Sequence, residues 1–236
     1  FIDPESHEDR VFIAALLEDN PYLDRVQYEK SLMQLDEVTR QQLRWGNWDV
    51  RPEGGKFKRE WFEIVDTVPP YGRLLRYWDT ASTAPKAGYD PDYTCGILVK
   101  WVQGVLYIMD VQRFRANPFT VEQRVGSTAA RDGLEVDIYM EEEPGSSGKA
   151  MISHYSRNVV SGYPFRGHRT TGSKEIRANP LSAAAQNGNV KLLRGGWNRD
   201  FLNELEAFPM GSHDDQVDAA SGAFEKLTSV PKGAFF

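Results

Sequence analysis

Acidic residues occur at three places in the sequence where a strand or a helix is expected to end or begin. Asp79 follows the mostly apolar run at residues 74–78, and three glutamates at residues 141–143 follow a second strand-like run. Asp214 and Asp215 open a helix-like stretch near the end of the chain. Hard divalent cations prefer oxygen ligands, and separate elements can bring their carboxylates together to bind one. The pattern therefore predicts metal-assisted chemistry on a phosphodiester bond.

Phosphodiester hydrolysis needs an activated water, relief of charge in the transition state and a stabilised leaving oxygen. Two divalent ions about 3.5–4 Å apart meet all three needs. Asp79, at the rigid end of a strand, suits the bridging position between them. Because side chains alternate along a strand, Glu141 and Glu143 share one face and Glu142 takes the other. Only part of the triplet can therefore face one site.

Each acidic cluster also has a simpler interpretation. Asp79 could form a turn, and the glutamates could mark a solvated strand end. Asp214 and Asp215 could cap a helix N-terminus, where the helix dipole favours a carboxylate by about 0.3–1 kcal/mol. The occurrence of all three clusters on elements expected to be neighbours favours the metal site.

The distribution of charge predicts an anion-binding face. The net charge is −6, but residues 149–199 carry nine Lys and Arg residues and the single acid Glu175, which leaves the rest of the chain at −14. A polyanion responds to local potential rather than to the total. Singly, each of these cations could be ordinary solvated surface charge.

Two glycine-containing segments adjoin this basic window. Residues 145–149 lack the spacing of a phosphate-binding loop and are interpreted as a tight turn whose helix N-terminus approaches a DNA phosphate. Residues 166–174 form a basic loop suited to clamping a nucleic-acid backbone. Asp90 and Asp92 are interpreted as turn residues, and His213 as a helix-capping or supporting partner of the acidic pair.

Composition indicates a globular protein. The chain has 236 residues, of which 40% are apolar and 26% charged, and no apolar run approaches the length of a membrane span. The single Cys95 excludes a disulfide within the chain and favours a reducing compartment. The chain begins at Phe1 without a leader, so we expect it to be a fragment of a longer protein.

The element pattern predicts one α/β domain. We expect a linker or adaptor at residues 1–70, the main domain at 71–230 and a tail at 231–236. Strands are expected at residues 73–79, 94–103, 105–111, 136–140, 163–165 and 190–193. Helices are expected at residues 119–131, 146–160, 174–187 with an interruption at Pro180, 198–208 and 214–227.

This order, three antiparallel strands and then alternating helices and strands, is that of the ribonuclease-H-like fold, a mixed sheet with helices on both faces. In such a fold Asp79 lies on the first strand and the glutamates end the fourth. Asp214 and Asp215 begin a helix that packs back over the first strand.

Three motifs in this order carry a resemblance to a known family. The sequences YWDTA at 77–81, EPGSSGK at 143–149 and HDDQVDA at 213–219 resemble the nuclease domain of tailed-bacteriophage large terminases. The sequences DNP at 19–21 and RWGNWD at 44–49 resemble the segment that links the packaging ATPase to that nuclease.

The resemblance implies a metal-dependent endonuclease with a RuvC-like fold and two Mg²⁺ or Mn²⁺ ions, which cuts concatemeric double-stranded viral DNA during genome packaging. Asp79 matches the metal-bridging aspartate. Glu143 matches the second ligand, with Glu142 and Glu141 as alternatives. Asp215 matches the third, supported or replaced by Asp214. Asp218 is expected to stabilise the helix. DNA contacts are expected from Lys149, Arg166, Arg169, Lys174 and Arg177.

The same resemblance implies partners and a location. The partners are double-stranded DNA, an ATPase domain absent from this chain, the portal protein and the small terminase subunit. The protein is expected in the host cytoplasm and transiently at the portal vertex of the procapsid, not in the mature virion. Because no Walker A sequence occurs, no ATPase activity is expected of this chain.

Two alternatives remain open at this point. The first is another ribonuclease-H-like enzyme, such as a resolvase or transposase, for which branched DNA would be the preferred substrate. The second is a non-catalytic DNA-binding module, in which Asp79→Ala would leave every activity unchanged.

Overall fold

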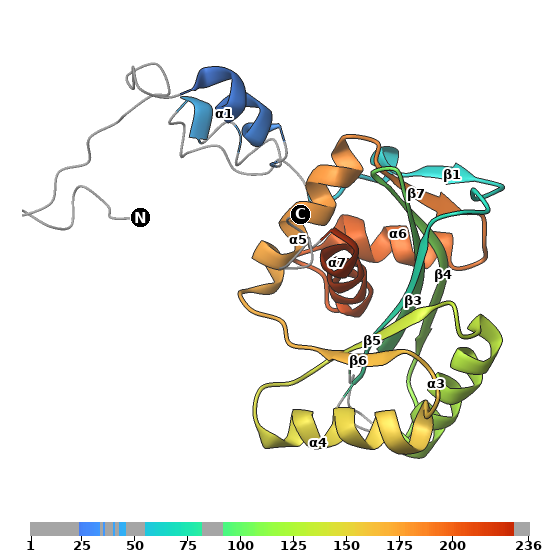
Figure 1. Ribbon diagram of the computed structural model, residues 1–236. Helices are drawn as coiled ribbons and strands as arrows, with labels where there is room; N and C mark the ends of the chain where they lie inside the picture. Colours follow the sequence, from blue (N-terminus) through green and yellow to red (C-terminus); the bar gives the residue numbers. More distant parts are fainter. Residues whose placement is uncertain are drawn as a thin grey trace, which may run out of the picture. The chain divides into compact units, whose positions relative to one another are not determined.

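The computed structural model describes residues 24–33, 35, 40, 43–45, 55–81 and 92–228 (Figure 1). The chain divides into two compact units, Phe1–Glu53 and Gly54–Phe236. In the first unit, helix α1 (Arg25–Leu32) forms part of the helical pattern expected there. The DNP motif, most of the RWGNWD motif and the tail at 231–236 lie outside the described residues.

The second unit is built on one seven-stranded mixed sheet in the order β1-β7-β4-β3-β2-β5-β6. Strands β2, β3 and β4 are antiparallel neighbours, and the remaining pairings are parallel. The strands are β1 (Glu63–Val65), β2 (Arg73–Asp79), β3 (Thr94–Val102), β4 (Val105–Phe114), β5 (Asp137–Glu141), β6 (Phe165–His168) and β7 (Val190–Leu193).

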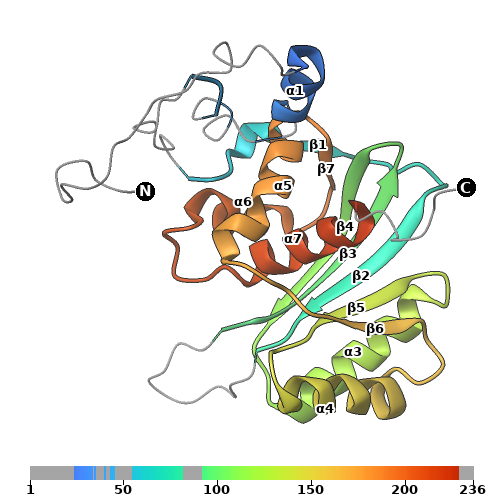
Figure 2. The same ribbon diagram turned by 60° about the vertical axis from the view of Figure 1, so that its left-hand side comes forward.

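Helices cover both faces of this sheet. In Figures 1 and 2, α5, α6 and α7 lie on one face, and α3 and α4 lie on the other. Their bounds are α3 (Pro118–Asp132), α4 (Ser146–His154), α5 (Lys174–Gln186), α6 (Asn198–Ala207) and α7 (Asp215–Thr228). The predicted mixed sheet with helices on both faces is confirmed. Among the described residues, no helix has the length and apolar character needed to cross a bilayer.

Several element ends follow from local sequence. The β3–β4 hairpin turns at Gln103 and Gly104, both of which have positive φ, as a type I′ turn requires. Helix α3 begins where the Asn117 side chain accepts a hydrogen bond from the Thr120 N–H, and it ends at Gly133 with φ of 85°, as the sequence predicts.

Four expectations differ from the structure. Helix α5 runs through Pro180 without interruption; Pro180 is exposed, so the peptide group whose hydrogen bond it removes can be hydrated. Strand β6 begins at Phe165, where the 163–165 strand was expected to end, because its backbone pairs with β5 up to Glu141 and His168. The helix expected at 146–160 becomes a π-helical turn at Tyr155–Val159. Strand β1 was not anticipated.

Residues 55–70 contribute to the sheet and the core. Strand β1 pairs with β7, and Phe57 and Phe62 are buried beside Phe208. A three-residue strand is too short to show a periodic pattern in the sequence, and its position depends on a partner more than a hundred residues away.

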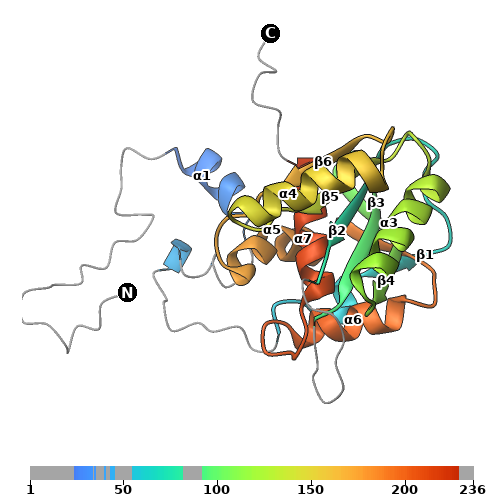
Figure 3. The same ribbon diagram turned by 90° about the horizontal axis from the view of Figure 1, so that it is seen from below.

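Alternation along β2 decides which way Asp79 faces. Leu75 and Tyr77 belong to the core beneath α5, α6 and α7, whereas Trp78 belongs to the core beneath α3 and α4. Asp79 is in phase with Leu75 and Tyr77, so it faces α7. Figure 3 shows α7 beside β2. The helix approaches closely because residue 222 is Gly: a Cβ there would lie 2.3 Å from Cζ of Tyr77.

Candidate active site

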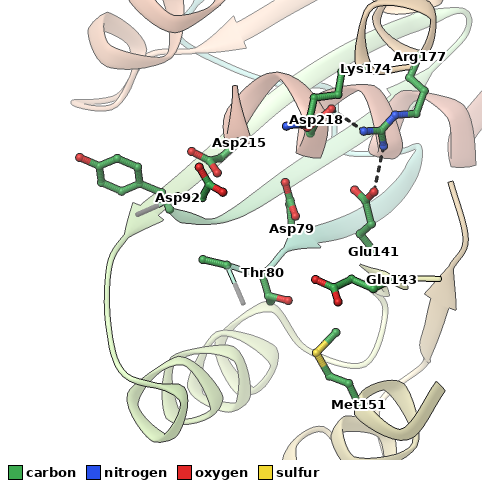
Figure 4. Close-up of a pocket in the computed structure, with 12 residues that line it drawn as sticks. Asp79, Thr80, Asp92, Glu141, Glu143, Met151, Lys174, Arg177, Asp215 and Asp218 are labelled. Carbon is green, nitrogen blue, oxygen red and sulfur yellow. Dashed lines mark hydrogen bonds and ion pairs between the residues drawn. The ribbon is translucent and has the colours of Figure 1, made fainter. Parts of the chain in front are cut away.

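Six carboxylates line a cleft of about 180 Å³ at the ends of β2 and β5 and the start of α7. They come from separate elements and surround the end of β2, as Figure 4 shows. The six residues are Asp79, Asp92, Glu141, Glu143, Asp215 and Asp218.

Asp79 is the central acid of this cleft. In Figure 4 its carboxylate lies between those of Asp215 and Glu141. Burial, reinforced by the charges of Glu141, Asp218 and Asp215, raises the pKa of Asp79 well above its usual value, and nearby Lys174 opposes the shift only in part. The ionised carboxylate is therefore costly at neutral pH unless a cation compensates it.

Asp215 and Asp218 reach the cleft from the first turn of α7. Residues three apart on a helix lie on the same face. Burial raises the pKa of Asp215 to about 6, with the charges of Glu204 and Asp92 adding to the shift and a hydrogen bond from the Tyr93 backbone opposing it. The Oδ2 atom of Asp215 is buried and has no hydrogen-bond partner, so it is available to a cation.

The three glutamates at the end of β5 separate as strand alternation predicts. Glu141 Oε1 accepts hydrogen bonds from Thr170 Oγ1 at 2.7 Å and from Arg177 Nη1 at 3.1 Å. Its Oε2 atom is buried without a partner. Glu143 is exposed and also lines the cleft. Glu142 does not line it and pairs instead with Arg169 at 3.1 Å.

Two cations neutralise part of this negative charge. Arg177 Nη2 lies 2.9 Å from Asp218 Oδ1. Lys174 Nζ lies 3.0 Å from Asp218 Oδ2 and 2.6 Å from Asp214 Oδ1. Both oxygens of Asp218 are thereby engaged. Asp214 is held beside the cleft through Lys174 and is not among the residues that line it.

The structure brings together part of the expected set. Asp79, Glu143 and Asp215 line one cleft, together with Lys174 and Arg177. The remaining expected DNA contacts lie outside it and are exposed: Lys149, Arg166 and Arg169.

Asp92 and Asp218 were assigned other roles from the sequence. Asp218 faces the cleft and its two cations, so its role is not confined to the helix. Asp92 was interpreted as a turn residue, but it lines the cleft. Antiparallel pairing places Asp79 opposite Cys95, so residues just before β3 must lie beside the end of β2. That pairing was a signal in the sequence that could have located Asp92.

The donor set fits a hard divalent cation. As placed in the described parts of the chain, no three His, Cys, Asp or Glu side chains stand close enough together to hold one ion. The cleft acids nevertheless offer oxygen donors only, the type that Mg²⁺ and Mn²⁺ prefer. Two of these oxygens, Glu141 Oε2 and Asp215 Oδ2, are buried and lack any other partner, a costly state that a bound cation would relieve.

The fold and the cleft together define a ribonuclease-H-like domain of the nuclease type. The chain belongs to the terminase RNaseH-like domain family, whose profile matches residues 76–227. The resemblance found in the sequence is thus confirmed for family and fold. No curated protein matches the chain.

Solved structures of terminases share the fold at low sequence identity. The full large terminase of a thermophilic bacteriophage has a TM-score of 0.64 and 12% identity, covering 90% of this chain and 54% of that one. The terminase nuclease domain of human cytomegalovirus, soaked with Mn and bound to an inhibitor, has a TM-score of 0.55 and 15% identity, with coverages of 73% and 95%. The large terminase nuclease of the thermophilic phage G20c gives 0.52 and 13%, with coverages of 74% and 99%. The chain therefore spans about half the length of the first of these large terminases.

Proposed function

We propose that this chain is a metal-dependent endonuclease that cuts double-stranded viral DNA concatemers during genome packaging. The observation that carries the proposal is the cleft itself: carboxylates from β2, β5 and α7 meet in a domain of the terminase RNaseH-like family. The cytomegalovirus nuclease domain was soaked with Mn, and a G20c nuclease structure contains zinc. Both support divalent-metal use here, and we propose two Mg²⁺ or Mn²⁺ ions.

Each acid of the cleft has a proposed role. Asp79, lying between the other acids, would be shared by both ions, and Asp215 would hold one of them through its unpartnered Oδ2. Bound divalent ions would activate the attacking water and stabilise charge on the leaving oxygen.

For the ligand from β5 we propose Glu141 ahead of Glu143. Thr170 and Arg177 fix one oxygen of Glu141 and leave the other buried and free, which is the arrangement that orients a ligand. Glu143 is exposed, so binding a metal would cost it more side-chain entropy. Glu143 would then act at the mouth of the cleft.

Contact with DNA would come from the exposed basic residues around the cleft. Lys149, Arg166 and Arg169 can reach phosphates, which position a duplex without reading its sequence. The Arg177 side chain is only 10% exposed, so its main proposed role is to hold Glu141 and Asp218. Lys174 is half exposed and can exchange a carboxylate for a phosphate.

The biological setting is proposed from the family. The protein would work with its own ATPase domain, the portal protein and the small terminase subunit, in the host cytoplasm and transiently at the portal vertex.

The test is cleavage of supercoiled plasmid by the purified chain with Mn²⁺ or Mg²⁺, beside an EDTA control and Asp79→Ala. Linear product that requires metal and disappears in the variant is expected. DNA binding without cleavage under any metal condition would contradict the proposal and favour a binding module. A strong preference for four-way junctions over plain duplex would favour a resolvase.

A further inference from the structure

Glu204 of α6 is a buried carboxylate next to the cleft but not part of its lining. Its side chain is 6% exposed. It accepts hydrogen bonds from the backbone N–H and from the side-chain Nε2 of Gln216, each at 2.6 Å. Arg113 Nε of β4 approaches its Oε2 to 3.2 Å. One buried acid thus joins α6, α7 and β4.

The first of these connections fixes the start of α7. Gln216 directly follows Asp215, the first residue of the helix. The first N–H groups of a helix have no partner within it, and a negative charge there is favoured by the helix dipole. Glu204 fills this role from a neighbouring helix, so it fixes the first turn from which the Asp215 carboxylate projects.

The second connection reaches Asp215 from the opposite side. The Arg113 guanidinium lies 3.5 Å from the centre of the Tyr93 ring, a cation–π contact. The backbone of Tyr93 hydrogen-bonds the Asp215 carboxylate. Removing the charge of Glu204 would release Arg113 and, through it, the segment that carries Tyr93. Both connections therefore end on Asp215.

We propose that Glu204 is a positioning residue for the metal ligand Asp215, which it orients through Gln216 on one side and through Arg113 and Tyr93 on the other. This inference rests on the proposed metal-dependent function. Glu204 touches neither substrate nor metal, and its buried charge adds to the negative potential that attracts a divalent cation.

The central test compares Glu204→Gln with Glu206→Gln in the full chain. The first change preserves shape but removes the acceptor that Arg113 and Gln216 Nε2 share. The second removes an exposed carboxylate from the same helix, where it pairs with Arg59 at 2.9 Å. Three quantities are measured for each: Mn²⁺ affinity by titration calorimetry, the Mn²⁺ concentration that gives half-maximal cleavage, and duplex affinity in EDTA.

For Glu204→Gln, Mn²⁺ affinity should fall and half-maximal cleavage should shift to higher Mn²⁺ by about tenfold or more, the effect typical of a group that orients a ligand. Duplex affinity in EDTA should stay within about twofold, because phosphate contacts dominate it. Glu206→Gln should match the wild type in all three. A folded Glu204→Gln protein with unchanged Mn²⁺ affinity would overturn the inference and leave Glu204 a purely structural acid.

A second variant covers the case in which Glu204→Gln does not fold. Arg113 is 25% exposed, and Arg113→Lys keeps the charge while losing the planar contact with Tyr93. It should weaken Mn²⁺ binding in the same direction, and unchanged Mn²⁺ affinity would overturn the inference. Calorimetry does not depend on cleavage, so wild-type Mn²⁺ binding without any cleavage would reject the proposed nuclease and still test Glu204.

Discussion

Arg177 and Asp218 form an ion pair of 2.9 Å across the cleft, and this pair joins the first turn of α5 to the first turn of α7. The same guanidinium holds Glu141 at 3.1 Å. One cation therefore fixes two carboxylates that come from different elements. Their positions depend on α5, an element that contributes no acid to the cleft.

Arg177→Ala should destabilise the protein because it leaves two carboxylates without their cation. Arg177 and Asp218 are 10% and 4% exposed, and breaking a buried pair costs about 3–5 kcal/mol. Lys174 still compensates Asp218 at 3.0 Å, so the lower end of that range is expected. Urea denaturation in EDTA measures the free energy of unfolding. The exposed Arg157 provides the control variant Arg157→Ala, and equal effects of the two changes would count against the role given to Arg177.

Asp79→Asn should stabilise the protein in EDTA while abolishing cleavage. Burial and neighbouring acids raise the pKa of Asp79, and each unit of such a shift corresponds to about 1.4 kcal/mol of free energy. Removing the charge should therefore raise the melting temperature, by about 1 kcal/mol or more in stability. Differential scanning fluorimetry with EDTA and then with Mn²⁺ measures both states. Mn²⁺ should raise the melting temperature of the wild type only; equal stabilisation of the variant by Mn²⁺ contradicts the assignment of Asp79 as a ligand.

Glu141→Gln should reduce cleavage far more than Glu143→Gln. Only Glu141 has a fixed carboxylate with a buried free oxygen. Loss of a few kcal/mol of charge stabilisation lowers the rate by about 100-fold or more, whereas the exposed Glu143 should cost less than about tenfold on the same scale. Single-turnover cleavage rates at saturating Mn²⁺ measure both variants. The reverse order would restore Glu143 as the ligand from β5.

His168 should make the protein less stable at acid pH. Its Nδ1 lies 2.8 Å from the Tyr77 hydroxyl and its Nε2 lies 3.4 Å from Glu225. Burial and the charge of Lys226 lower the pKa of His168, against the opposing charges of Glu225 and Glu141. The unfolded chain therefore takes up this proton first, and stability is lost as the pH falls below about 6.5.

The measurement for His168 is the difference in melting temperature between wild type and His168→Gln at pH 7.5 and pH 5. Asp79 and Asp215 have raised pKa values and shift stability in the opposite sense in both proteins, so the difference isolates the histidine. The wild type should lose stability relative to the variant at the lower pH. A difference that does not change with pH contradicts the prediction.

Arg166→Ala and Arg169→Ala should weaken duplex binding and its dependence on salt. Each phosphate that a variant no longer neutralises should lower the slope of log affinity against log salt by about 0.9. Fluorescence anisotropy in EDTA over a salt series measures the slope. Arg194 is a matched control because it is exposed and already paired with Asp66, so Arg194→Ala should leave the slope unchanged. An equal fall for Arg194→Ala would mean that the effect comes from net charge alone.

The sequence predicts those parts of the cleft that depend on local pattern. Asp79 ends a strand and Asp215 begins a helix, and both boundaries can be read from periodicity and from turn residues. The order of the long elements follows from the same signals, so the mixed sheet was predictable.

The remaining features depend on register between distant elements. Which of Glu141 and Glu143 is held in place depends on Thr170 and Arg177, which lie about thirty residues further along the chain. Asp92 enters the cleft only because β3 pairs with β2. The role of Glu204 depends on the contact between α6 and the first turn of α7. No local periodicity encodes such contacts.

The most direct test of the central claim is a Mn²⁺ titration of plasmid cleavage by the wild type and by Asp79→Asn, with duplex binding measured on the same samples. Because the variant should be at least as stable as the wild type, loss of folding cannot explain a loss of cleavage. Saturable, EDTA-sensitive cleavage by the wild type and none by a variant that still binds duplex is the predicted result. Cleavage by Asp79→Asn at the wild-type rate would contradict the account.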